Sequence, residues 1–309
     1  PGGCWYLYEL TKDEKWKNAA EKFQAIFETH KTNVTNHDLG FVFNCSYGNA
    51  YRITKNEDFK KVLITAGNSL ITRFNSNVGC IKSWDVEEGW QSTRGWKFPV
   101  IIDNMMNLEL LFELTNLTGD DKYRNVAITH ANTTLKNHFR DDNSSYHVID
   151  YDPETGEVRN KNTAQGYAHE SAWARGQAWG IYGYTVCYRY TKDIRFLEQA
   201  QKIAKYITEY KGTPEDGIPY WDYNAPNIPN EPRDVSAAAV TVSALIELDS
   251  YSEISYLPAI DKIMNSLASP EYTAKIGKNK NFLLKHSVGS IPHGAEIDVP
   301  LNYADYYYL

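Results

Sequence analysis

One sequence pattern recurs through the chain and limits what it can fold into: an apolar, aromatic helix end, a short polar turn, then an amphipathic helix. The polar turn is clearest at Thr11-Lys12-Asp13 and at Thr191-Lys192-Asp193. In each copy Thr or Asp can cap the following helix while an aromatic residue packs on its first turn. The copies lie about 45 to 75 residues apart, which is typical of repeated helical hairpins. They occupy residues 5–16, 50–59, 110–123, 187–196 and, more weakly, 245–256.

Apolar residues at helical spacing, such as Phe23, Ile26 and Phe27, predict an all-α chain. Strand signals are few: residues 146–149 read as a strand, followed by a turn at 152–156. Repeated hairpins that close a ring, with long loops gathered at one mouth, predict an α/α toroid; an open solenoid is the alternative. The predicted helices cover residues 3–10, 13–30, 38–54, 57–74, 101–116, 120–138, 171–190, 193–210, 234–248 and 257–268.

Composition narrows the classes of function. No apolar run is long enough to span a bilayer. The net charge of −7 and the lack of a basic patch argue against nucleic acid as a partner. No linker interrupts the sequence, so we expect one domain over residues 1–309, with an N-terminal helix missing before Pro1. Four scattered cysteines read as small core residues, without a disulfide framework or metal spacing: Cys4, Cys45, Cys80 and Cys187.

Residues 165–180, QGYAHESAWARGQAWG, form the most informative local motif. Flat Trp173 and Trp179 rings can stack on a sugar, while Arg175 and the glutamines Gln165 and Gln177 can bind hydroxyls and a carboxylate. The alternative is a buried helix whose tryptophans are core packing. We expect no cofactor and no metal, since the chain lacks a Walker loop, GxGxxG, HExxH and GxSxG, and its histidines lack a ligand spacing.

Two carboxylates stand out beside apolar residues. Asp103 lies in IDNMMNL, residues 102–108, with Asn104 and Asn107 as polar companions. It is either a helix N-cap or a general acid whose pKa is raised by apolar neighbours. Asp38, in HDLGF, is likewise a helix cap next to a surface His37, or a second carboxylate. Paired carboxylates are the usual apparatus of glycosidic chemistry.

These segments, together with residues 81–85, 146–156 and 297–309, resemble the unsaturated glucuronyl hydrolases of glycoside hydrolase family 88. The resemblance implies an (α/α)6 barrel and hydration of the C4=C5 double bond that polysaccharide lyases leave on a terminal uronic acid. It implies that Asp103 is the general acid and base and that Asp38 is the second essential carboxylate. The ligands implied are unsaturated uronate disaccharides or short oligosaccharides from glycosaminoglycans, acted on by a monomer or a weak homo-oligomer.

Further site residues follow from the same resemblance. Trp84, Trp173 and Trp179 would stack on or wall the sugar, while His147, Gln165 and Arg175 would bind uronate oxygens. Two serines of HSVGS, Ser287 and Ser290, would face the substrate. The chain departs from the family at Ala164, where a histidine is usual, at His169, where an acidic residue is usual, and at Pro292, where some members that accept sulfated substrates carry lysine.

Two other functions fit the same barrel. One is an unsaturated rhamnogalacturonyl hydrolase that acts on pectin fragments, although the motif at residues 165–179 favours the glucuronyl activity. The other is a non-catalytic sugar-binding protein, against which the retained Asp103 and Asp38 argue. Enzymes that follow lyases act in a bacterial periplasm or cytoplasm, and we expect one of these locations.

Overall fold

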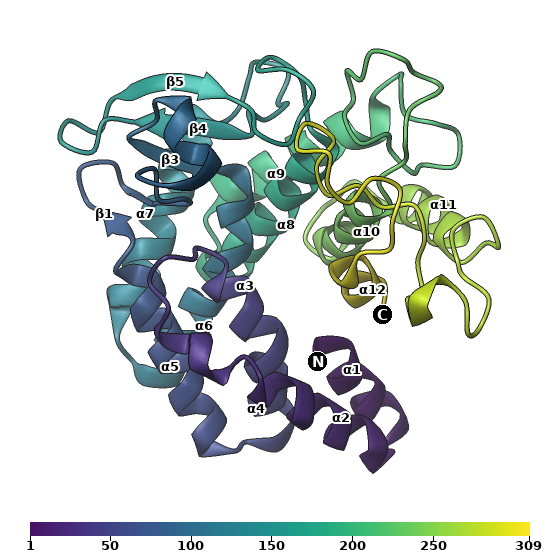
Figure 1. Ribbon diagram of the computed structural model, residues 1–309, viewed down its shortest axis with the longest axis horizontal. Coiled ribbons are helices and arrows are strands. Elements are labelled where there is room, and N and C mark those ends of the chain that lie inside the picture. The colour runs from purple at the N-terminus through teal and green to yellow at the C-terminus, as the bar shows by residue number, and fades with distance from the viewer. The chain divides into compact units, whose positions relative to one another are not determined.

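The computed structural model describes all 309 residues and is predominantly helical, as predicted (Figure 1). The chain divides into two compact units. Unit 1 comprises Pro1–Thr134, Asp150–Arg159 and Leu309, and unit 2 comprises Leu135–Ile149 and Asn160–Tyr308. No helix is both long and apolar enough to span a membrane.

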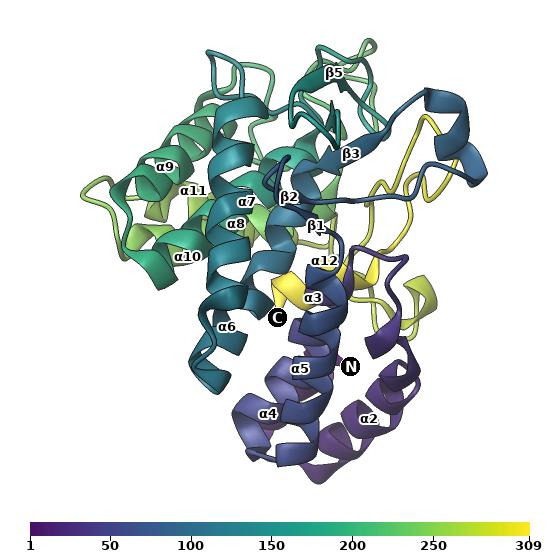
Figure 2. The same ribbon diagram turned by 90° about the vertical axis from the view of Figure 1, so that its left-hand side faces the viewer.

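Unit 1 is built from short helices packed in succession. Its helical elements are α1 (Gly2–Thr11), α2 (Glu14–Ala25), η1 (Glu28–Thr32), α3 (Leu39–Phe43), η2 (Asn44–Gly48), α4 (Asn49–Thr54), α5 (Glu57–Ile71), η3 (Gly89–Arg94), η4 (Ile102–Asn107), α6 (Leu108–Thr118) and most of α7 (Asp121–Asn137). Helix α1 packs against α2 and α4, and α5 packs against α3, η1 and α6; Figure 2 shows α3, α4 and α5 together.

Five short strands accompany these helices. Strand β1 (Phe74–Asn75) pairs antiparallel with β2 (Cys80–Ile81). Strands β3 (Phe98–Ile101), β4 (Val148–Tyr151) and β5 (Val158–Asn162) form a second sheet in the order β3-β4-β5. The predicted turn at 152–156 joins β4 to β5, and the Gly156 N–H closes it by donating to Asp152 O at 2.8 Å. Both sheets lie beside the segments that carry predicted site residues.

Unit 2 is organised around α8 (Ala174–Thr191) and α10 (Val235–Asp249), which pack against each other. Helix α8 is buried on nearly all sides, whereas α9 (Ile194–Glu209) buries one stripe that includes Phe196, Ala200 and Ile203. Helix α8 therefore lies inside unit 2, whereas the amphipathic α9 lies at its surface. The remaining elements are α11 (Leu257–Leu267), η5 (Asn279–Asn281) and α12 (Asn302–Tyr308).

In the structure, the repeated sequence pattern forms the same turn at four places. The first helix of each hairpin ends in a Thr whose Oγ1 accepts the N–H of the residue two positions on, at 3.1–3.3 Å. The intervening residue has positive φ, which completes a left-handed helix end. A carboxylate or amide then caps the next helix, as Asp13 does for Lys15 N–H at 3.0 Å. The four turns begin at Thr11, Thr54, Thr118 and Thr191.

Several predicted boundaries differ from the structure. The helix predicted from residue 101 begins as β3 and the tight turn η4, and the one predicted from residue 171 begins at Ala174. Strands β1, β2, β3 and β5 and helix α12 were not predicted. All four cysteines are free, as predicted, but only Cys80 and Cys187 are buried, and burial raises the pKa of both thiols. The single-domain assignment stays a prediction.

Candidate functional site

Asp103 lies in η4, a 3-10 turn whose six residues are all buried. Asp103 itself is buried, with only 7% of the residue exposed. Asp103 caps neither η4, whose N-cap is Ile101, nor α6, whose N-cap is Asn107. The helix-cap interpretation is therefore wrong, because the chain tightens into a 3-10 turn before α6 begins. What remains is the other interpretation, a buried carboxyl group that acts as a general acid, and this role stays a prediction.

Amide side chains fix that turn against its neighbours. Asn104 Nδ2 donates to Ile81 O at 2.7 Å and to Ser83 Oγ at 3.0 Å. Asn107 Oδ1 accepts the N–H of Phe41 at 2.9 Å, which ties η4 to the first turn of α3. Gly40 makes the close approach possible, since a Cβ there would lie 2.6 Å from Asn107 Cα. The turn that bears Asp103 is thus fastened to the helix start that bears Asp38.

Asp38 occupies the N-cap position of α3, but its side chain makes no capping hydrogen bond. The carboxylate is 38% exposed, and Oδ1 instead lies 3.0 Å from His37 Nε2. His37 is buried, with 6% exposed, so its expected surface position is wrong. Burial is the main cause that lowers the pKa of His37; nearby Arg73 adds to the lowering and Asp38 opposes it. A neutral imidazole therefore orients the second carboxylate.

The lowered pKa of His37 predicts an acid-sensitive fold. In the unfolded chain this histidine binds a proton near its ordinary pKa, whereas the folded chain resists protonation. The free energy of unfolding should therefore decrease as pH falls below about 6.5, by at most about 1.4 kcal/mol per pH unit. Urea unfolding at pH 7.5 and pH 5 measures it. His37→Gln should flatten the slope and the exposed His30→Gln should not; equal slopes in wild type and His37→Gln would contradict the assignment.

Trp84 lies between β2 and β3, in a segment held by Arg73. The Arg73 guanidinium donates to Lys82 O at 2.9 Å and Ser83 O at 3.3 Å. Trp84 stacks on Trp96, with ring centroids 5.8 Å apart, and meets Trp90 edge to face at 5.1 Å. The two neighbouring tryptophans were not among the predicted site residues, although the loop at 84–96 is visibly rich in tryptophan. The Trp84 ring also meets the His37 ring edge to face at 6.1 Å, so unit 1 places this tryptophan cluster next to the segment that bears Asp38.

In unit 2, His147 precedes β4 and is 3% exposed. Its Nδ1 accepts the N–H groups of Ala164 at 3.0 Å and Gln165 at 3.1 Å. Main-chain N–H groups can only donate, so Nδ1 bears no proton and the neutral ring carries its proton on Nε2. The ring also packs on Trp173, with centroids 4.6 Å apart. The Nε2–H is therefore the hydrogen-bond donor of the His147 ring, and its contact with a uronate stays a prediction.

Arg175 is buried and bonded to protein acceptors. Its guanidinium pairs with Asp234 at 3.0 Å, donates to Val288 O and Gly289 O, and lies 4.5 Å from the Trp173 ring centroid. Gln165 Nε2 also donates to Gly289 O, at 3.1 Å. Arg175 and Gln165 thus fix the backbone between Ser287 and Ser290. A direct contact of Arg175 with a uronate stays a prediction.

The remaining predicted residues divide into two groups. Trp173 Nε1 and Ser287 Oγ are buried without a hydrogen-bond partner, which is uncommon for buried polar atoms, and their contact with a ligand stays a prediction. Ser290 Oγ lies 2.7 Å from His293 Nδ1. By contrast, Trp179 packs edge to face on Tyr307 with centroids 5.6 Å apart, and Gln177 accepts Ser145 N–H at 2.6 Å. These two contacts are the core packing considered as the alternative for this motif.

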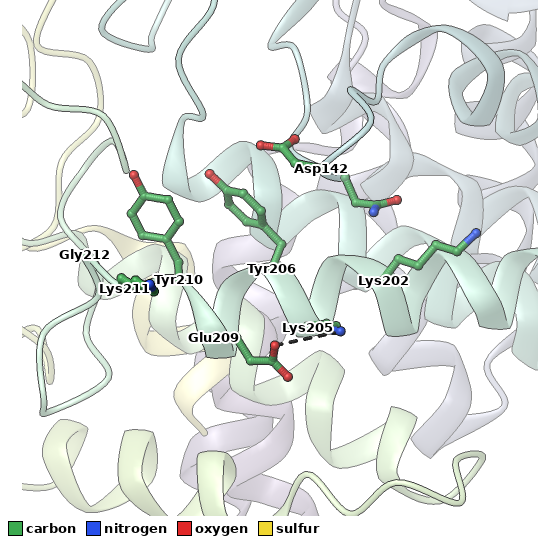
Figure 3. Close-up of a pocket in the computed structure, with 9 residues that line it drawn as sticks. Asp142, Lys202, Lys205, Tyr206, Glu209, Tyr210, Lys211 and Gly212 are labelled. Carbon is green, nitrogen blue, oxygen red and sulfur yellow. Dashed lines mark ion pairs between the residues drawn. The ribbon is translucent and has the colours of Figure 1, made fainter.

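Two of the three positions at which the chain departs from the family, Ala164 and His169, lie in the segment at residues 163–169. Ala164 is buried, and its N–H is one of the two donors to His147. His169 is exposed, and its Nδ1 accepts Thr163 N–H at 3.1 Å. A cavity of about 660 Å³ also opens in unit 2 (Figure 3), lined by Asp142, by Tyr206 of α9 and by Tyr210, which directly follows α9. None of the predicted site residues lines it.

Comparison with known proteins identifies the family. The Glycosyl Hydrolase Family 88 model matches residues 2–308. An unsaturated glucuronyl hydrolase of Formosa agariphila is 47% identical over 311 residues, 100% of this chain and 76% of that protein. An unsaturated chondroitin disaccharide hydrolase of Streptococcus agalactiae is 35% identical, over 99% of this chain and 78% of that protein.

Solved structures agree with the sequence match. A crystal structure of an unsaturated glucuronyl hydrolase specific for heparin has a TM-score of 0.95 at 48% identity, and covers 100% of this chain and 82% of that one. A variant enzyme from Streptococcus agalactiae, complexed with dGlcA-GalNAc6S, has a TM-score of 0.82 at 34% identity, covering 99% of this chain and 76% of that one. The chain belongs to glycosyl hydrolase family 88.

Proposed function

We propose that this chain is an unsaturated glucuronyl hydrolase that acts on glycosaminoglycan fragments produced by lyases. The observation that supports it most is the fastening of the buried Asp103 turn to the helix start that bears Asp38, through Asn107 and Phe41. This arrangement supplies one enclosed carboxyl group and one exposed carboxylate, as acid-base hydration of a double bond requires.

In the proposed reaction Asp103 donates a proton to C4 of the unsaturated uronate. Water adds its oxygen to C5 and returns its second proton to the Asp103 carboxylate. The product is a hemiketal, which opens as the bond between C5 and the ring oxygen breaks, leaving a ketone at C5. The hemiacetal at C1 then expels the neighbouring sugar as an alcohol and becomes an aldehyde. One water molecule is consumed in the whole sequence, and the carboxyl group is regenerated.

The other predicted residues bind rather than react. The His147 Nε2–H would donate to a uronate oxygen, and Trp173 Nε1 and Ser287 Oγ would gain the partners that they lack within the protein. Trp84 would cover a sugar face. We also propose that the helical hairpins belong to a single (α/α)6 barrel. The pairing of α1 with α2 and of α8 with α9, together with the TM-score of 0.95, supports this architecture.

Turnover of defined unsaturated disaccharides tests the activity. Disaccharides from heparin, chondroitin, hyaluronan and rhamnogalacturonan would be incubated with the protein, and loss of the ultraviolet absorbance of the double bond would be followed with release of the neighbouring sugar. We expect both signals with at least one glycosaminoglycan substrate. Turnover of the pectin fragment alone would favour the rhamnogalacturonyl activity. Binding measured by calorimetry with no loss of absorbance would favour a binding protein.

A further inference from the structure

Asp222 is a fully buried carboxylate in the connection between α9 and α10. Its Oδ2 accepts the Tyr167 N–H at 2.9 Å and the Ser171 hydroxyl at 2.7 Å. Its Oδ1 accepts the Asn224 N–H at 2.9 Å. Each of these groups donates to Asp222, so the ionised side chain, which only accepts, matches them. Hydrogen bonds to a charged acceptor are the stronger ones in proteins.

The residues next to Asp222 also hold the chain from 163 to 174 by hydrogen bonds, and we call this set of contacts, with those of Asp222 itself, the clasp. Tyr223 N–H donates to Ala172 O at 2.9 Å, and Ala172 N–H donates to Asn224 Oδ1 at 3.0 Å. A Cβ on Gly166 would lie 2.7 Å from Thr163 Oγ1 and 3.1 Å from Asp222 Oδ2, so the glycine allows the backbone to lie close to both side chains. The segment carries Gln165 and Trp173 and has no helix or strand of its own before α8.

We propose that Asp222 is the positioning residue for sugar binding in unit 2: it holds residues 165–173 in the binding conformation without touching the sugar. The inference rests on the proposed function. An irregular segment left loose must be ordered when the ligand binds, and each residue that becomes fixed loses conformational entropy. A segment that is already ordered avoids that cost, so its anchor acts on affinity more than on chemistry.

A single substitution tests whether Asp222 holds the segment in this way. Asp222→Asn keeps the shape of the side chain but turns one of its two acceptor atoms into an N–H₂ donor. If the amide nitrogen faces Tyr167 and Ser171, the main-chain N–H of Tyr167 has no acceptor. If the amide nitrogen faces Asn224, the main-chain N–H of Asn224 loses its acceptor instead. Either orientation places an amide N–H₂ donor against a main-chain N–H donor, which loosens the clasp.

We expect Asp222→Asn to raise KM for an unsaturated disaccharide about 10- to 100-fold, as loss of one bond to a charged acceptor implies, and to change kcat less than threefold. Ser171→Ala, which removes one of the three donors, should raise KM by a smaller factor and keeps the test open should Asp222→Asn fold poorly. Asp249→Asn is the matched control, since Asp249 Oδ1 accepts Tyr256 N–H at 2.6 Å in a turn distant in sequence.

Amide hydrogen exchange adds a readout that needs no substrate. Exchange should accelerate at residues 165–173 in Asp222→Asn and not in Asp249→Asn. An unchanged KM and unchanged exchange in Asp222→Asn would overturn the proposal, as would an equal fall of kcat in both variants. A wild-type protein that turns over none of the disaccharides would overturn the proposed function, while the exchange result would still report on the clasp.

The pH profile gives a second test. Burial raises the pKa of Asp222, against the lowering effect of its three hydrogen bonds and of Arg140; the phenols of Tyr206, Tyr210 and Tyr223 also face it. Protonation replaces an acceptor by a donor, so KM of the wild type should rise as pH falls through that raised pKa. Asp222→Asn should lack this rise, and an identical profile in both proteins would contradict the role.

Discussion

Asp103→Asn is expected to lower kcat for unsaturated disaccharides by about a thousandfold, within the range of 10²–10⁴ typical of general acid-base groups. Asparagine fills the same space in η4 but has no proton to give to C4. The turn itself is held by Asn104 and Asn107, so the fold should persist. Loss of double-bond absorbance under single-turnover conditions would measure the chemical step.

Binding and a neutral substitution serve as controls for this effect. Calorimetry should show disaccharide affinity within a few-fold of wild type, because Asp103 acts on the reaction rather than on binding. Asp121→Asn, at the exposed start of α7 in the same unit, should retain full turnover. Near-normal kcat in Asp103→Asn would remove Asp103 from the acid role, and with it the proposed mechanism.

Asp234→Ala is expected to be the most destabilising single change in unit 2. Asp234 is fully buried, pairs with Arg175 at 3.0 Å, and caps α10 by accepting Ser236 N–H at 3.0 Å. Removing the carboxylate leaves a buried guanidinium without its counter-charge and α10 without its cap. The free energy of unfolding should fall by about 3–5 kcal/mol, measured by urea unfolding with circular dichroism.

The same two helices supply a matched comparison. Arg189 of α8 pairs with Glu247 of α10 at 2.5 Å, but these side chains are 32% and 23% exposed. Solvent screens a partly exposed pair, so Glu247→Ala should cost about 1 kcal/mol or less. Combining Asp234→Ala with Arg175→Met should recover part of the loss, since no buried charge then remains. A cost for Asp234→Ala no larger than that for Glu247→Ala would contradict the argument.

Most of the helices could be predicted from the sequence because their signals are local. Apolar spacing and the capping residues lie within a few positions of one another, as at Thr191 and Asp193. Strands β1 and β2 have two residues each, too few for an alternating pattern. Helix α12, with the sequence NYADYYY, offers no clear apolar stripe.

The candidate site could be predicted only in part, for a related reason. Residues such as Asp103 and Gln165 stand in recognisable motifs, so a family resemblance identifies them. The residues that hold these site residues in place do not stand in such motifs. Arg175 is 114 positions from Gly289, and Asp222 is 55 positions from Tyr167. Nothing in the sequence near Asp222 indicates that its carboxylate turns inward toward a main-chain N–H, so only the folded structure assigns it.

The repeated turn that starts at Thr11, Thr54, Thr118 and Thr191 gives the two ends of each hairpin different roles, one structural and one that carries the predicted site. A three-residue turn of fixed geometry leaves no room for variation at one end. The opposite ends are joined by long connections, and the predicted acid, the second carboxylate, His147, Gln165 and both serines all lie in these or at their borders. Insertions and substitutions there leave the turns intact. New substrate preferences can therefore arise in this scaffold without the helices having to be packed again.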